Sequence, residues 1–288
     1  MQEKKKVVDI VIYVVLTVLA VAFLVPIALV IMNSLKSKLY ISTTPFVLPN
    51  EENFVGLKNY VEGLTKIHFF DSVGYSLFIT VFSVLAIVIF CSMTAWFITR
   101  VKTKLTSAIY YMFIASMVVP FQMVMYTMTK TADVLKLNNY VGIIVIYLGF
   151  GAAMAVFMFS GFVNGIPMEL EEAALIDGCN PLTMFIKVVF PMLKPISITV
   201  AILNAMWIWN DYLLPYLLIG TKYRTIPVAI QYLKSGYGSI DYGHLMAAIV
   251  VALIPIVVFY FACQKYIIEG DSFSNNLSHD FSSFLSRL

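Results

Sequence analysis

The sequence predicts an all-α integral membrane protein with six transmembrane helices. Hydrophobic residues make up 60% of the chain and charged residues only 12%, which is more apolar surface than one soluble core can bury. Six nearly uncharged stretches each reach the roughly 20 residues that a helix needs to cross the hydrocarbon core. No segment alternates with the period of two typical of membrane barrels. Helices are therefore expected throughout, because lipid offers the backbone no hydrogen bonds.

The six expected spans lie at residues 11–32, 75–99, 106–128, 140–163, 196–219 and 244–264. The lysines at 4–6 precede the first run as they would in a signal peptide. That run is long and lacks a convincing small-residue cleavage site, so we expect an uncleaved span. The basic clusters at 4–6 and 100–104 favour a cytoplasmic N-terminus under the positive-inside rule.

This topology divides the chain into three parts. We expect a cytoplasmic N-terminus at 1–10, a transmembrane domain at 11–267 and a cytoplasmic tail at 268–288. The tail has helical spacing at Phe281, Phe284, Leu285 and Leu288. It is either a short amphipathic helix or a disordered Ser-rich end.

Composition argues against several function classes. The net charge of +3 is small and scattered, so no nucleic-acid surface is expected. The cysteines lie far apart without CxxC spacing, and His68, His244 and His279 stand at loop or tail positions, so we expect no metal site and no catalytic residues. The P-loop pattern GxxxxGK followed by Ser or Thr is absent from the sequence. The chain is therefore not expected to be an enzyme that hydrolyses ATP by that route.

One polar segment, NGIPMELEEAALIDGCNPLTMFIKVVFPMLKP at 164–195, separates the fourth and fifth spans on the expected cytoplasmic side. Gly178 is a natural helix stop, and Asn180 followed by Pro181 is a start signal for a second helix that runs toward Pro191. The segment is thus predicted to form a helix, a tight turn and a second helix outside the bilayer core.

The first of these helices has one low, flat face. Leu170, Ala173 and Ala174 fall at i, i+3 and i+4, and acidic residues flank them. Such a face can enter a groove on another protein. The alternative is a solvated amphipathic loop whose charges only keep it in water.

The stretch EEAALIDGCNPLTMFIKVVFP resembles the EAA signature of permease subunits of ABC importers. Glu-Ala-Ala at 172–174 is followed by a glycine four residues on and by an apolar stretch that ends in Pro191. Val188 and Phe190 depart mildly from the usual Ile and Leu. In that family the loop forms a coupling helix that docks in a cleft on a separate cytoplasmic ATPase.

The resemblance assigns roles within this loop. It implies that Glu172 supplies the charged contact, that Ala173 and Ala174 permit close approach and that Gly178 allows the turn. The residues expected to act in ATPase coupling are Glu171, Glu172, Ala173, Ala174, Asp177, Gly178 and Pro191.

Residues 10–268 extend the resemblance to carbohydrate permeases, in particular the second, maltose-type subunit. PFVLPNEENFVGLKNYVEGL is similar to their external segment, VVPFQMVMYTMTK to their third span and IWNDYLLP to their fifth. This implies import of a di- or oligosaccharide across the bacterial cytoplasmic membrane. It also implies a second homologous permease, an extracytoplasmic sugar-binding protein and two cytoplasmic ATPase subunits that bind ATP and Mg, with no cofactor in this chain.

The fifth span is also a plausible wall of a substrate path. Polar and aromatic residues fall within a third of its circumference, and they suit the hydroxyls and C–H faces of sugars. Gln122, beside Pro120 in the third span, is a second wall. The alternative is that the amides bond neighbouring helices and the tryptophans sit in an interface belt. The candidate path residues are Asn204, Trp207, Asn210, Asp211 and Gln122.

Two other functions are open. The first is an ABC permease for a non-sugar solute. The second is an ion-coupled secondary transporter, which usually has buried carboxylate or histidine relays. Asp211 is the only acidic residue inside an expected span, which disfavours the second. The tail EGDSFSNNLSHDFSSFLSRL departs from the Gly-rich ending common in the family.

Overall fold

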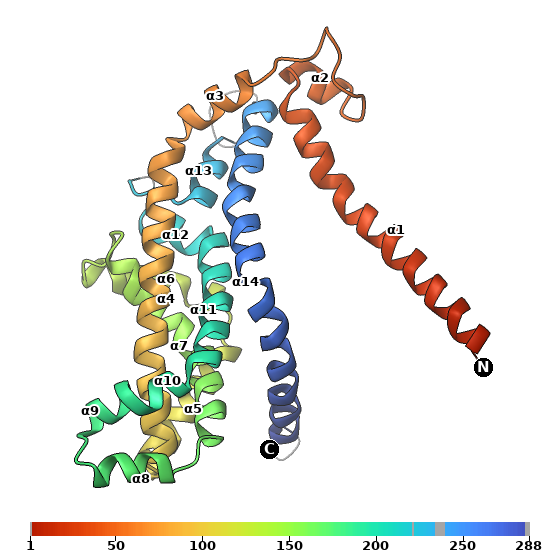
Figure 1. Ribbon diagram of the computed structural model, residues 1–288. Helices are drawn as coiled ribbons and strands as arrows, with labels where there is room; N and C mark the ends of the chain where they lie inside the picture. Colours follow the sequence, from red (N-terminus) through yellow and green to blue (C-terminus); the bar gives the residue numbers. More distant parts are fainter. Residues whose placement is uncertain (1, 221, 234–239, 286–288) are drawn as a thin grey trace. The chain divides into compact units, whose positions relative to one another are not determined.

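The computed structural model describes residues 2–220, 222–233 and 240–285, with side chains only within 9–264 (Figure 1). Within these residues the chain is helical and contains no strand; Lys36 and Phe54 form an isolated antiparallel bridge. The predicted all-α class is therefore confirmed.

The longer helices are α1 (Gln2–Ser34), α4 (Phe69–Arg100), α5 (Lys104–Val118), α6 (Phe121–Val134), α7 (Gly142–Asn164), α11 (Lys194–Asn210) and α14 (Tyr242–Leu285). The shorter ones are α2 (Lys38–Thr43), α3 (Lys58–Lys66), α8 (Glu169–Ile176), α9 (Pro181–Met184), the π-helix η1 (Phe185–Val189), α10 (Phe190–Met192), α12 (Leu213–Leu218) and α13 (Ile226–Tyr232).

Among the described residues, four helices are individually long and apolar enough to cross a membrane: Asp9–Ser34, Phe69–Arg100, Gly142–Asn164 and Tyr242–Gln264. Two bent pairs also qualify, α5 with α6 at 111° and Pro181–Met192 with α11 at 78°. Counting each pair as one span gives the six that were predicted, so the protein is a multi-pass membrane protein.

The third and fifth spans are less regular than the sequence predicted. Pro120 lies between α5 and α6 and acts as the N-cap of α6, where its missing N–H costs no hydrogen bond. The fifth span ends at Asn210 instead of 219, because Asp211 caps α11 and α12 starts as a separate helix at Leu213. Proline and an end cap thus interrupt two runs that hydropathy alone treats as continuous.

For the tail at 268–288, the structure tests only the predicted backbone conformation. α14 continues to Leu285, so the tail is helical as far as that residue. The side chains of Phe281, Phe284 and Leu285 are not described, and Leu288 lies outside the described residues.

The chain divides into two compact units, and one of them consists of Asp71–Val228 with Phe259 onward. Its core is formed by buried apolar side chains of α4, α7, α11 and α12, together with the π-helix and Ala132 of α6, and partly buried side chains of α5 pack against it. Tyr147 and Phe159 of α7 are among the largest side chains that are fully buried. α7 therefore lies at the centre of this unit.

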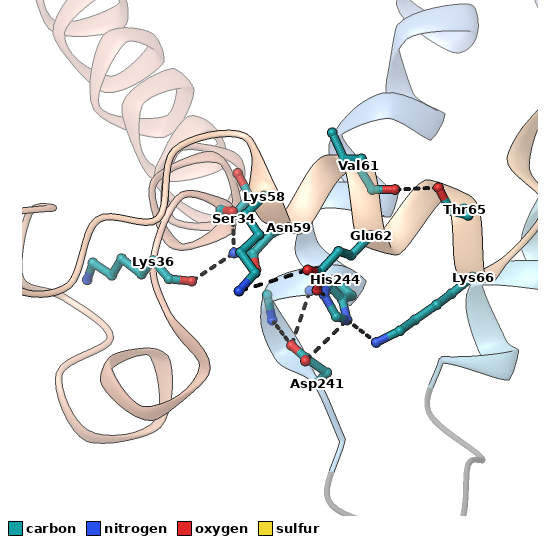
Figure 2. A network of polar contacts seen from close by, with 11 residues as sticks. Ser34, Lys36, Lys58, Asn59, Val61, Glu62, Thr65, Lys66, Asp241 and His244 are labelled. Carbon is teal, nitrogen blue, oxygen red and sulfur yellow. Dashed lines mark hydrogen bonds and ion pairs between the residues drawn. The ribbon is translucent and has the colours of Figure 1, made fainter.

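The other unit consists of the residues up to Phe70 and Ala229–Val258, and a polar network holds it together (Figure 2). His244 is 4% exposed; its Nε2 lies 3.0 Å from Glu62 Oε2, and its Nδ1 lies 2.9 Å from Lys66 Nζ and 3.1 Å from Asp241 Oδ2. Asn59 Nδ2 donates to the carbonyl of Ser34, the last residue of α1, and to that of Lys36, both at 2.8 Å. These contacts fix α3, inside the long connection expected after the first span, against the start of α14.

The start of α7 offers a test of this packing. A Cβ added at Gly142 would overlap the carbonyl oxygen of Leu137, whereas one added at Gly149 of the same helix would meet no heavy atom within 4 Å. We expect Gly142→Ala to lower the free energy of unfolding by about 1–3 kcal/mol, the usual cost of overpacking. Gly149→Ala, the control, should leave it unchanged or higher. Thermal unfolding in detergent measures both, and equal melting temperatures for the two variants would contradict the packing at Gly142.

Candidate functional site

The polar segment between α7 and α11 has the local structure that its sequence predicted. Gly178, directly after α8, has a φ of +81°, in the left-handed region that glycine adopts without strain. The side chain of Asn180 accepts a hydrogen bond from the Thr183 N–H at 2.8 Å, and Pro181 occupies the first turn of α9. The second helical run continues through η1 and α10 to Met192, close to the predicted end at Pro191.

Glu171 is bound from α4 by a basic and an aromatic side chain. Its Oε1 accepts from Arg100 Nε and lies 2.8 Å from both Nε and Nη2, and its Oε2 accepts from Trp96 Nε1 at 2.9 Å. Arg100 Nη2 also donates to the Ile166 carbonyl, just before α8, at 2.9 Å. The side chain of Glu171 is only 5% exposed. This carboxylate therefore lies inside the chain, although the sequence grouped it with the docking residues.

The open side of the segment carries acidic and apolar side chains together. Glu172, Ala173, Asp177, Gly178 and Pro191 are all exposed. Exposed apolar side chains accompany them on both helical runs: Leu170, Leu175, Ile176, Leu182 and Ile186. The tip of this surface, Ile176, is 86% exposed.

Ala174 differs from the sequence prediction. It is 7% exposed and faces the rest of the chain, so it does not share the open face with Leu170 and Ala173. Leu170 and Ala174, at i and i+4, are separated by about 40° around the helix, and the edge of the buried face falls between these two positions. Ala174 permits close packing within the chain itself.

At the end of α11 the structure brings together three of the predicted path residues. Asp211 Oδ1 accepts from the Leu213 and Leu214 N–H groups at 3.0 and 3.4 Å. Its Oδ2 accepts from the Tyr147 hydroxyl at 3.0 Å. The ring of Tyr147 lies edge-to-face on Trp207, with centroids 5.5 Å apart.

The exposed members of this group are Trp207 and Asn210. Trp207 is 41% exposed, and the amide of Asn210 donates within its own helix to Met206 O at 2.7 Å. Tyr147 itself is fully buried and serves as a support for Asp211 and Trp207. The group offers an indole face and an amide next to a carboxylate with a fixed orientation.

Asn204 is a correction to the predicted path. It is fully buried, its Nδ2 donates to Val200 O within α11, and its Oδ1 has no partner among the described residues. A Cβ at Gly151 of α7 would lie 2.9 Å from that oxygen and 2.6 Å from Ile87 of α4. Asn204 is therefore enclosed by α4 and α7, which fits the alternative of a contact between helices.

Gln122 is exposed in the first turn of α6. Pro120 next to it stands at the 111° break between α5 and α6, so the predicted bend is present.

Sequence reasoning missed Arg100, Trp96 and Tyr147 as members of these sites. Arg100 contributed only to the charge bias of the topology. Its spacing of four residues from Trp96 places both side chains on one face of α4 near its C-terminal end, and the sequence already contained this signal. Tyr147 stands in a continuous apolar run, where no pattern separates it from a lipid-facing tyrosine.

Comparison with known families identifies the chain. Residues 87–269 match the family described as binding-protein-dependent transport system inner membrane component. The chain belongs to this family, whose members are permease components of transporters.

Curated relatives match over nearly the whole chain. The chain is 38% identical to the probable starch degradation products transport system permease protein AmyC of Thermoanaerobacterium thermosulfurigenes, over 88% of this chain and 91% of that protein. It is 36% identical to the multiple sugar-binding transport system permease protein MsmG of Streptococcus mutans, over 90% and 94%. It is 33% identical to the melibiose/raffinose/stachyose import permease protein MelC of Bacillus subtilis, over 88% and 91%.

A solved structure shares the fold. The chain is similar to a chain of a bacterial ABC transporter involved in the import of the acidic polysaccharide alginate, with a TM-score of 0.76, 23% identity, and coverage of 91% of this chain and 97% of that one. At this identity the likeness concerns the fold. The recognition of a transporter permease from the EAA-like residues is thus confirmed at the level of the family.

The Tyr147–Asp211 hydrogen bond can be tested by removing the hydroxyl alone. We expect Tyr147→Phe to lower the free energy of unfolding by about 1.5–3 kcal/mol, the usual contribution of a hydrogen bond to a charged group. Tyr216→Phe is the matched control, because Tyr216 is 45% exposed and keeps its ring in the variant. Thermal unfolding in detergent compares the two; an equal effect would mean that the hydroxyl of Tyr147 contributes nothing to the group.

Proposed function

We propose that this chain is the transmembrane permease subunit of an ATP-driven importer of di- or oligosaccharides. The observation that carries the proposal is the set of relatives named as permeases for starch degradation products, multiple sugars and melibiose/raffinose/stachyose, which match at 33–38% identity over 88–90% of this chain. The exposed indole and amide at the end of α11 support the same substrate class, because they suit the C–H faces and hydroxyls of sugars.

In this proposal the N-terminus and the α8 segment lie on the cytoplasmic side. Glu172 and the exposed apolar residues of α8 and α9 dock on a separate ATPase, which holds ATP and Mg. Gly178 supports the proposal, because its φ of +81° folds the segment into a protruding tip. Two ATPase subunits, a second homologous permease and an extracytoplasmic sugar-binding protein complete the assembly. The permease itself supplies a path and no catalytic residue.

Within the path, the proposal assigns Trp207 and Asn210 to contact the sugar and Asp211 to hold the end of α11. Gln122 adds an amide from α6. Asn204 is left out, because α4 and α7 cover it. In this proposal the path contacts the sugar only weakly, so a few exposed polar and aromatic groups are sufficient for passage. The sugar-binding protein selects the solute.

The substrate class is tested with the complete assembly in lipid vesicles. Candidate sugars, including maltose, maltotriose, melibiose and raffinose, are added with the sugar-binding protein, and ATP hydrolysis is measured. We expect at least one of these sugars to stimulate hydrolysis, whereas a peptide mixture and inorganic phosphate should not. Stimulation by peptide or phosphate with no response to any sugar would overturn the assignment to carbohydrate.

The docking role of α8 is tested by reversing one exposed charge. We expect Glu172→Lys to lower sugar uptake by about tenfold or more, equivalent to a loss of about 1.4 kcal/mol of coupling or docking free energy. The variant should still accumulate in the membrane, because Glu172 is exposed. Glu51→Lys, which makes the same change in the proposed external connection, is the control. Normal uptake by the Glu172 variant would contradict the docking role.

A further inference from the structure

We propose that Arg100 and Trp96 of α4 are coupling residues, which carry the movement of α8 to α4 through Glu171. The inference rests on the proposed function, in which α8 docks on the ATPase. It reassigns Glu171 from the docking surface to the connection between the docking helix and a membrane span.

Glu171 is buried and already paired within the chain, so it is not available to a partner protein. Its two carboxylate oxygens accept from Arg100 and Trp96 at 2.8–2.9 Å, and its side chain is 5% exposed. The adjacent Glu172 is exposed and remains available for docking. The two neighbouring glutamates of α8 therefore have different roles: Glu171 points into the chain and Glu172 points outward.

Arg100, at the C-terminal end of α4, binds both α8 and the short segment that precedes it. The guanidinium bonds both Glu171 and the Ile166 carbonyl, and its side chain is 14% exposed. Charge-assisted hydrogen bonds of this kind are short, directional and stronger than neutral ones. A displacement of α8 therefore pulls on the C-terminal end of α4 directly.

Trp96 connects the same end of α4 to the second arm of the segment. Its indole N–H binds Glu171, and its ring lies 5.5 Å from that of Phe185 in η1. Phe185 in turn packs on Phe190 at 5.8 Å. The indole thus contacts both arms, α8 and η1, and holds them to one helix face.

The two routes from α8 into the membrane differ in stiffness. α4 is a single helix of 32 residues without an internal proline, about 48 Å long at 1.5 Å per residue. The route through η1 to α11 contains a π-helix and a 78° bend, and such features mark hinges. α4 is therefore expected to transmit a movement of α8 as a rigid helix, whereas the route to α11 can bend at the π-helix and at the break before α11.

The experiment compares Glu171→Gln, Arg100→Met and the double variant with two matched controls. Glu169→Gln and Lys102→Met make the same chemical changes two residues away, at exposed side chains. Each protein is assembled with its ATPases, second permease and sugar-binding protein in vesicles. The measurements are retention of the ATPase subunits, basal ATP hydrolysis, thermal stability and sugar taken up per ATP hydrolysed.

We expect the Glu171 and Arg100 variants to keep the ATPases and basal hydrolysis, while sugar taken up per ATP falls about tenfold or more, within the range of about 5- to 150-fold typical of allosteric coupling. The double variant should be no worse than either single one, because both remove the same interaction. The controls should match the wild type. A merely structural pair would lower stability or assembly and leave sugar per ATP unchanged, and that result overturns the inference.

Trp96→Phe provides a milder change for the case in which a charge variant fails to assemble. It removes one N–H donor and keeps a ring against Phe185. A reduced yield of sugar per ATP with normal assembly supports the connection, and an unchanged yield overturns it. A wild-type assembly that shows no sugar-stimulated hydrolysis would instead overturn the proposed function, and the inference with it.

Discussion

The hydrocarbon core offers the backbone no hydrogen-bond partners, and this constraint decides where the helices of this chain can end. At each break between helices, a local residue either pairs the unpaired backbone N–H groups or removes the need to pair one. Asp211 accepts from the first N–H groups of α12, those of Leu213 and Leu214. Pro120 brings no N–H to the start of α6, and Thr103 caps α5 with its own side chain. The breaks are thus built into the sequence, and Asp211, which caps one of them, also belongs to a candidate site.

The same constraint separates the parts of the chain by mechanical role. A helix whose backbone hydrogen bonds are uninterrupted, such as α4, moves as a rigid body. A run interrupted by a π-helix, a proline or a cap, such as the one from α9 to α12, can change its angle at low cost because the local bonds are already rearranged. The proposed importer contains both kinds of element. The polar segment after α7 touches both, through Arg100 on one side and through η1 on the other.

Hydropathy and local turn chemistry were sufficient to predict the helical class, the number of candidate spans and the structure around Gly178 and Asn180, but not the breaks in the third and fifth spans. Periodicity could not show which face of a span meets protein, because lipid tails and a protein interior are equally apolar. Asn204 was placed on the path for this reason, whereas it is buried between helices. The different positions of Glu171 and Glu172 depend on Arg100, which lies 71 residues before Glu171, and no local pattern contains that information.

In the proposed function, α8 contacts the ATPase and lies on the cytoplasmic side of the membrane. The direct measurement is photo-crosslinking in the complete assembly, with a photoreactive residue at Ile176, which is 86% exposed, or at Leu57, which is 68% exposed and lies in the proposed external connection. We expect a crosslink from position 176 to an ATPase subunit and no crosslink to that subunit from position 57. A crosslink to the ATPase from position 57, with none from position 176, would contradict it.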